Sequence, residues 1–215
     1  MTPQKKILLV EGRDDEHVVV HFCTARGIGK LDKIEDSKGV EKLVTGFPIR
    51  LKQSGIEVLG VVVDADTDLT SRWMALRTHL EKAGYLNLPG QPKPNGTIVQ
   101  PPVDSLLPRV GIWLMPNNQT TGILEDFLTL LIPDGDELFE HSNRSIDSIP
   151  SNQRRFSEVA RPKALIHTWL AWQAEPGKPL GISITARYLN PHHPRADQFV
   201  DWLRELFFPP GSIVV

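Results

Sequence analysis

The chain has 215 residues, of which 40% are hydrophobic and 23% are charged, and its formal net charge is -2. This length and composition are typical of one globular domain with a single core. The longest apolar runs fall far short of the roughly 20 residues needed to cross a bilayer, and no signal-peptide pattern is present. A single cysteine, Cys23, excludes an internal disulfide and a Cys-based zinc site. We therefore expect a cytoplasmic protein without a membrane segment, in which oxygen ligands would hold any metal ion.

Strand-like and helix-like segments alternate along the first 132 residues. Apolar runs predict strands over residues 6–10, 31–34, 58–63, 97–100 and 110–115. Amphipathic patterns predict helices over residues 14–25, 40–54, 69–83 and 123–132. Pro48 could break the second helix, Gly55 is its candidate C-cap and Gly84 closes the third helix. Such alternation predicts an α/β fold with a mostly parallel sheet flanked by helices.

The remainder of the chain is expected to be mainly helical, with helices over residues 137–149, 162–174 and 196–207. We expect an α/β domain over residues 1–135 and a helical extension over residues 136–215 that packs on it. Acidic side chains outnumber basic ones by 20 to 15 over residues 1–140, whereas basic side chains outnumber acidic ones by 9 to 6 over residues 141–215. Either the extension approaches an anionic substrate, or the uneven charge is a chance feature of a soluble protein.

Acidic side chains follow two of the predicted strands directly. Glu11 comes after the run Ile7–Val10, and Asp64 and Asp66 come after Val61–Val63. Because the carboxyl ends of parallel strands share one edge of a sheet, these carboxylates are expected to converge. Converging carboxylates raise one another's pKa or bind a cation, and Mg²⁺ or Mn²⁺ prefers oxygen ligands. Asp68 could join this site or could cap the following helix.

The motifs Leu9-Val10-Glu11-Gly12 and Val62-Val63-Asp64-Ala65-Asp66 resemble the Toprim signature of topoisomerases, primases and OLD-family nucleases. The resemblance covers roughly residues 5–132, and the whole chain is similar to a family of small uncharacterised bacterial Toprim-related proteins of unknown function. It implies a Toprim-like, Rossmann-like fold and Mg²⁺-dependent cleavage or joining of phosphodiester bonds in nucleic acid. By this resemblance Glu11 is a general acid/base or metal ligand, and Asp64 and Asp66 bind the ion.

The OLD-like branch of that superfamily implies further site residues. Asp15 lies four positions after Glu11, where that branch has a second carboxylate. Glu125 and Asp126 resemble its later acidic motif and are candidate ligands of a second metal ion. That branch also has a basic residue downstream, and Lys163 is the candidate for this role. Lys163 would stabilise the charge of a substrate phosphate. Arg13, beside Glu11, is the next candidate for phosphate contact.

Other features restrict this interpretation and leave alternatives open. The chain lacks a recognisable nucleophilic tyrosine motif and a phosphate-binding loop of an ATPase, which excludes a topoisomerase and a complete OLD protein. A stand-alone nuclease, or a component that acts with a separate protein partner, remains. A non-catalytic module that binds metal, nucleotide or a partner is the main alternative. A haloacid-dehalogenase-like phosphatase is a lesser one, because Asp64-Ala65-Asp66 also resembles its nucleophile motif, although Asp68 departs from it.

Overall fold

Five strands form one sheet in the order β2-β1-β3-β5-β4. The computed structural model describes residues 5–210. The strands are β1 (Lys5–Val10), β2 (Lys33–Asp36), β3 (Ile56–Asp64), β4 (Thr97–Val99) and β5 (Arg109–Met115). All neighbouring strands are parallel except β4, which pairs antiparallel with β5. The sheet is therefore mostly parallel, as predicted.

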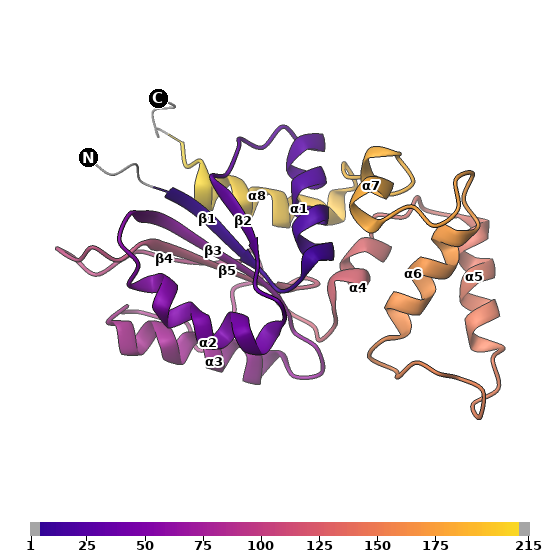
Figure 1. Cartoon of the computed structure of the whole chain (residues 1–215), viewed down its shortest axis with the longest axis horizontal. Coiled ribbons are helices and arrows are strands. Elements are labelled where there is room, and N and C mark those ends of the chain that lie inside the picture. The colour runs from indigo at the N-terminus through magenta and orange to yellow at the C-terminus, as the bar shows by residue number, and fades with distance from the viewer. Residues whose placement is uncertain (1–4, 211–215) are drawn as a thin grey trace.

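Helices cover both faces of the sheet and extend beyond its carboxyl edge. They are α1 (Arg13–Ala25), α2 (Val40–Leu51), α3 (Leu69–Ala83), α4 (Leu124–Thr129), α5 (Glu137–Asp147), α6 (Arg161–Ala171), α7 (Leu180–Thr185), the 3₁₀ helix η1 (Pro194–Ala196) and α8 (Asp197–Phe207). In Figure 1, α2 and α3 lie on one face of the sheet, and α1 and α8 lie on the other. Helices α5 and α6 pack together past the carboxyl ends of the strands (Figure 1).

Side chains of the central strands alternate between two hydrophobic cores, as the two-residue period of a strand requires. Leu9, Val61 and Val63 pack against α2 and α3. Leu8 and Val62 pack on the opposite face, in a core that also includes residues of α1, α4, α6, α7 and α8. This second core therefore joins the first part of the chain to its helical C-terminal part.

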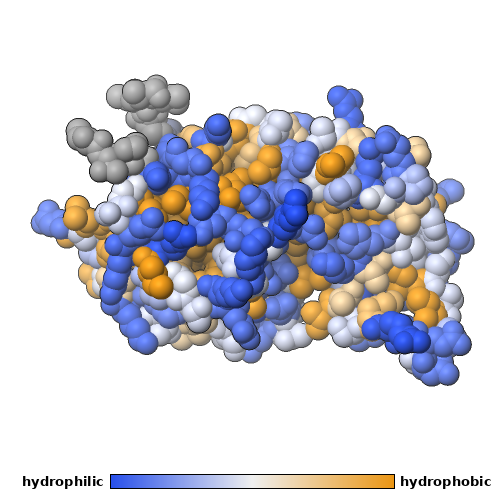
Figure 2. All heavy atoms as spheres, in the orientation of Figure 1, coloured by the Kyte–Doolittle hydropathy of each residue, from blue (hydrophilic) through white to orange (hydrophobic). Residues whose placement is uncertain are grey.

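The outer surface is mixed in character. Hydrophilic residues cover most of the face shown in Figure 2, and hydrophobic residues lie between them in small groups. Within residues 5–210, no helix combines the length and the apolar character that a membrane span requires.

The predicted elements match the structure with a few corrections. Strand β2 lies two residues later than predicted because its pairing with β1 sets its position, and its polar sequence carries little strand signal. Helix α2 continues through Pro48 and ends at Leu51, so Gly55 is not its C-cap. Gly55 instead accepts a hydrogen bond from the backbone N–H of Lys5 at the start of the sheet. Gly84 does close α3, with a φ of 95°.

A pair of glycines lets α8 approach the sheet closely. Gly60 of β3 and Gly111 of β5 are direct neighbours in the strand register. A Cβ atom on Gly111 would lie 2.3 Å from Leu206 Cδ2, and one on Gly60 would lie 2.8 Å from Phe207 Cζ. The missing side chains at these two positions leave room for the last turn of α8, so α8 forms part of the helical layer on this face of the sheet (Figure 1).

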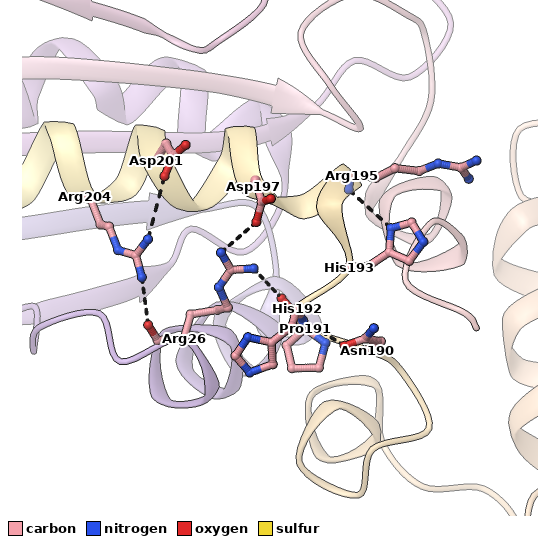
Figure 3. A network of polar contacts seen from close by, with 9 residues as sticks. All are labelled: Arg26, Asn190, Pro191, His192, His193, Arg195, Asp197, Asp201 and Arg204. Carbon is pink, nitrogen blue, oxygen red and sulfur yellow. Dashed lines mark hydrogen bonds and ion pairs between the residues drawn. The ribbon is translucent and has the colours of Figure 1, made fainter. Parts of the chain in front are cut away.

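A polar network fastens the end of α1 to α8 and to the loop before it (Figure 3). Arg26 Nη2 lies 2.7 Å from Asp197 Oδ1, and Arg26 Nη1 donates a 2.9 Å hydrogen bond to the carbonyl oxygen of Pro191. Arg204 Nη2 donates a 3.0 Å hydrogen bond to the carbonyl oxygen of Arg26. The Arg26 guanidinium is largely buried, so both of its partners contribute to the stability of this junction.

Replacing Arg26 with alanine is expected to lower the free energy of unfolding by about 2 kcal/mol, because a charged hydrogen bond and an ion pair are lost together. Urea denaturation followed by circular dichroism measures this change. Arg155→Ala, at an exposed position, is the matched control and should shift the midpoint little. Equal effects of the two substitutions would show that the network does not stabilise the fold.

Candidate functional site

An acidic cleft of about 400 Å³ opens at the carboxyl ends of β1 and β3. Its charged lining residues are Glu11, Arg13, Asp14, Asp15, Asp36, Lys38, Asp64, Glu125 and Lys163. The structure thus brings together six of the eight predicted site residues. This edge is where working residues of open α/β sheets lie.

The turn from β1 into α1 positions two carboxylates. Strand β1 ends at Val10, Glu11 follows, and α1 begins after Gly12, whose extended backbone forms the N-cap. The side chain of Asp15 is only 8% exposed and accepts a 3.1 Å hydrogen bond through Oδ2 from the backbone N–H of Gly12. Its other oxygen, Oδ1, is buried without a hydrogen-bond partner. Asp15 therefore caps the helix with one oxygen and leaves the other available.

Backbone pairing joins the Asp64 loop to α4. Asp66 and Gly122 exchange two backbone hydrogen bonds of 2.9 Å, which form an isolated antiparallel bridge. This bridge holds the start of α4 beside the end of β3. Glu125, in the first turn of α4, is 4% exposed, and its Oε1 lies 3.2 Å from Lys163 Nζ at the start of α6. Residues from four separate segments thus share one cleft.

Burial and mutual repulsion raise the pKa values of the cleft carboxyl groups. Burial is the largest cause for Asp64, followed by the negative charges of Asp15, Glu11 and other acids, and the pKa rises to about 9. Burial and the charge of Glu11 raise the pKa of Asp15 to about 7. Burial also raises the pKa of Glu11, against a hydrogen bond from the backbone of Asp64. Concentrated negative charge of this kind favours either protonation or a bound cation.

Lys163 remains a cation at the rim of this cleft. Partial burial lowers the pKa of its ammonium group, but the neighbouring Glu125 carboxylate outweighs that effect and raises the pKa overall. The Lys163 side chain is about half exposed, so its charge is accessible from solvent.

The donor set fits a hard divalent cation in its chemistry. Glu11 Oε2, Asp15 Oδ1 and Asp64 Oδ1 are buried and have no hydrogen-bond partner. Carboxylate oxygens are the ligands that Mg²⁺ and Mn²⁺ prefer. As arranged, however, no group of three or more His, Cys, Asp or Glu side chains within residues 5–210 could hold a metal ion. Joint coordination therefore requires these side chains to turn toward a common point.

Two predicted ligands are engaged elsewhere. Asp66 Oδ2 lies 2.6 Å from Arg72 Nη2, and Asp66 does not line the cleft. Asp126 Oδ2 accepts a 2.8 Å hydrogen bond from the backbone N–H of Ile123 and so caps α4. Asp68 likewise caps α3, since its Oδ1 accepts a 2.9 Å hydrogen bond from the backbone N–H of Ser71. The capping alternative considered for Asp68 is therefore the one observed.

Sequence reasoning missed Arg72, which clamps the loop that carries Asp64. Its Nε donates a 3.0 Å hydrogen bond to the carbonyl oxygen of Asp64, while Nη2 pairs with Asp66. An arginine one turn after a helix N-cap gives no motif signal, and only the fold brings it onto the loop. Lys38 and Gly39, directly before α2, also line the cleft, and sequence reasoning missed them as well.

Gly122 controls the position of α4 relative to Asp64. Its φ is 143°, and an added Cβ would lie 2.7 Å from Asp126 Oδ2 and 3.0 Å from Pro116 Cδ. We expect Gly122→Ala to lower the free energy of unfolding by about 2 kcal/mol, because it combines backbone strain with a clash at the helix cap. Thermal unfolding checks this effect, with Gly135→Ala as the control: its φ is also positive, but nothing lies near its Cβ. A loss no greater than that of the control would show that the clash is relieved without cost.

Comparison with known proteins identifies one family. The family model described as "Protein of unknown function (DUF3226)" matches residues 5–208, which is nearly the whole chain. Searches of curated proteins and of solved structures found no match to this chain. The matched region includes both cores and every residue of the acidic cleft. The chain belongs to the family of proteins of unknown function DUF3226.

Proposed function

We propose that this protein is a Mg²⁺- or Mn²⁺-dependent phosphodiesterase of the Toprim type that acts on nucleic acid. One observation carries the proposal: three carboxylates that line a single cleft each have a buried oxygen without a partner. Such oxygens are costly to bury unless a ligand satisfies them. The order of the Glu-Gly and Asp-x-Asp motifs, and their position at the carboxyl ends of β1 and β3, agrees with this proposal.

Glu11, Asp15 and Asp64 would hold the ion. When bound, it would supply charge stabilisation for a phosphoryl group and lower the pKa of a water molecule. If Asp15 and Asp64 alone hold the ion, Glu11 would instead act as the general acid or base: its side chain would accept a proton from an attacking water molecule or donate one to a leaving oxygen.

Lys163 and Arg13 would bind the substrate phosphate. Lys163 Nζ lies at the rim, bound to Glu125 on its protein side, with about half of its side chain exposed. Arg13 is exposed beside Glu11. Fixed cations in these positions would attract an anionic backbone to an otherwise acidic cleft and offset charge that develops on the phosphate.

A second candidate is a module that binds metal, nucleotide or a protein partner without turnover. Two observations favour it: Asp66 is already paired with Arg72, and no group of acidic side chains within residues 5–210 is preformed for a metal ion. Binding without cleavage would separate this candidate from the enzyme.

The test incubates the full chain with single- and double-stranded DNA and RNA in Mg²⁺ or Mn²⁺. We expect cleavage that a chelator abolishes and that Asp64→Asn reduces at least about a hundredfold, as for loss of an essential charge-stabilising group. Asp68→Asn is the matched control. Asp68 is an acid of the same loop, and asparagine at this position preserves its N-cap hydrogen bond.

Cleavage that survives in Asp64→Asn would overturn the assignment of the site. Calorimetric titration with Mn²⁺ separates the remaining outcomes. Mn²⁺ binding that depends on Asp64 but is accompanied by no cleavage of any substrate would favour the non-catalytic module. Absence of both Mn²⁺ binding and cleavage would contradict the phosphodiesterase and the metal-binding form of the module.

A further inference from the structure

A second cavity lies at the opposite end of the sheet from the acidic cleft. It has a volume of about 480 Å³, within the range typical of small-molecule sites. Its walls come from the amino ends of β1, β3 and β5, the loop before β5 and the end of α8, and include Lys6, Val58, Leu107, Arg109, Leu206 and Phe207. None of these residues takes part in the proposed phosphodiesterase site.

Two cationic residues of this cavity stand in one row across the sheet. Lys6 of β1 pairs in register with Val58 of β3, and Val58 pairs with Arg109 of β5. Residues in register on parallel strands point to the same face, and adjacent strands lie about 4.8 Å apart, so the Cα atoms of Lys6 and Arg109 are separated by roughly 10 Å. The strand register thus fixes both cations on either side of a buried valine.

Neither cation has a carboxylate partner within residues 5–210. Lys6 Nζ lies 4.5 Å from the centre of the Phe208 ring. Arg109 Nε is buried and has no hydrogen-bond partner. Glu57 also lines the cavity but forms no ion pair with Lys6 or Arg109. Burying a guanidinium nitrogen that has no hydrogen-bond partner costs free energy. An anion in the cavity would accept a hydrogen bond from this nitrogen and offset that cost.

The rest of the lining is mainly apolar. The ends of α8 and β3 supply Leu206, Phe207 and Val58, all of them buried within the core. Leu106 is 99% exposed at the mouth, where an apolar ligand would cover it. A ligand that suits both parts of this lining has an anionic head and an apolar body.

We propose that this cavity binds a small anionic amphiphile, with its carboxylate or phosphate head on Arg109 and Lys6 and its apolar body along Leu106 and Leu107. The planar guanidinium of Arg109 suits either head group, because both accept paired N–H donors. The site is independent of the acidic cleft, so it stands whether or not the protein cleaves nucleic acid.

Calorimetric titration of the full chain with decanoate, decyl phosphate and decanol, each below its micelle-forming concentration, tests the proposal. We expect decanoate or decyl phosphate to bind at least about tenfold more tightly than decanol, since the charged hydrogen bonds are lost with the alcohol. The anion that binds more tightly identifies the head group. Arg109→Gln should weaken that binding about tenfold, whereas Lys82→Ala, an exposed cation on α3 away from the cavity, should not.

Any of three results would overturn the proposal: no binding of either anion, equal binding of decanol, or anion binding unchanged by Arg109→Gln. Circular dichroism of each variant shows whether it is folded. If Arg109→Gln does not fold, Lys6→Gln replaces it, with the same expected loss of affinity. Asp64→Asn should bind the anion normally, which separates this site from the acidic cleft.

Discussion

Asp64→Asn is expected to raise the free energy of unfolding at pH 7 by up to about 4 kcal/mol in the absence of divalent ions. The folded state holds this carboxyl group protonated, because its pKa rises from 3.8 to about 9 among buried neighbouring acids. Folding at pH 7 must therefore supply a proton, at about 1.4 kcal/mol per pH unit above 3.8. Asparagine is nearly the same size, needs no proton and removes this cost. Guanidinium denaturation of both proteins measures the difference.

The same shift predicts how stability depends on pH. A carboxyl group with a raised pKa in the folded state stabilises the fold fully below its unfolded pKa, and this contribution is lost as pH rises through the folded pKa. For Asp64 the loss runs from about pH 4 to about pH 9, and Asp15 adds to it up to about pH 7. We expect the free energy of unfolding to fall across this window, and to fall less in Asp64→Asn.

Added Mg²⁺ or Mn²⁺ supplies the control. An ion that binds the folded chain alone raises the free energy of unfolding in proportion to the logarithm of its concentration. Wild type and Asp68→Asn should both gain stability, whereas Asp64→Asn should gain little. A decrease in stability of Asp64→Asn at neutral pH would contradict the electrostatic account. An equal ion effect in all three proteins would place the ion elsewhere.

Convergence of the acids was predictable because it follows from two local patterns and one topological rule. Apolar runs that end in Glu11 and Asp64 identify the strand ends, and a parallel sheet sends both ends to the same edge. The structure places β1 and β3 as direct neighbours in the centre of the sheet. The candidate sites at Asp15 and Glu125 came from the resemblance, and both residues line the cleft.

Side-chain orientation within the acidic motifs was not predictable in this way. Asp66 and Asp126 are each adjacent or nearly adjacent to a cleft residue, yet Arg72 binds the first and a helix N-terminus binds the second. Which of two neighbouring acids faces a cleft depends on the exact turn of the backbone, here on a φ of 51° at Asp66. Spacing along the sequence does not carry that information.

Tertiary packing also explains helix α7, which local sequence patterns did not indicate. Helix α7 has the sequence LGISIT, in which glycine and β-branched residues disfavour a helix. It packs on α1 so closely that a Cβ on Gly181 would lie 2.8 Å from the carbonyl oxygen of His17. The glycine that weakens the helical signal is thus what permits the contact.

Gly111→Val is expected to lower the free energy of unfolding by about 3 kcal/mol or more. A Cβ at this position would lie 2.3 Å from Leu206 Cδ2, 2.9 Å from Cδ1 and 3.0 Å from Cγ. Rotation of Leu206 gives little relief, because it is fully buried. The last turn of α8 would have to move away from the sheet, which opens the core on that face. Chemical denaturation measures the loss, and tryptophan fluorescence reports on Trp202, which α8 carries into the same core.

Gly46→Ala provides the matched control, since it also adds a side chain to a glycine within a regular element. Nothing lies within 4 Å of a Cβ at Gly46 in α2, so this substitution should raise the free energy of unfolding by about 0.5–1 kcal/mol through the better helix propensity of alanine. The two changes therefore differ in sign, although valine suits a strand as well as alanine suits a helix. If Gly111→Val were neutral, α8 would not pack on the central strands as closely as Gly60 and Gly111 imply. The helical C-terminal part would then be separable from the sheet.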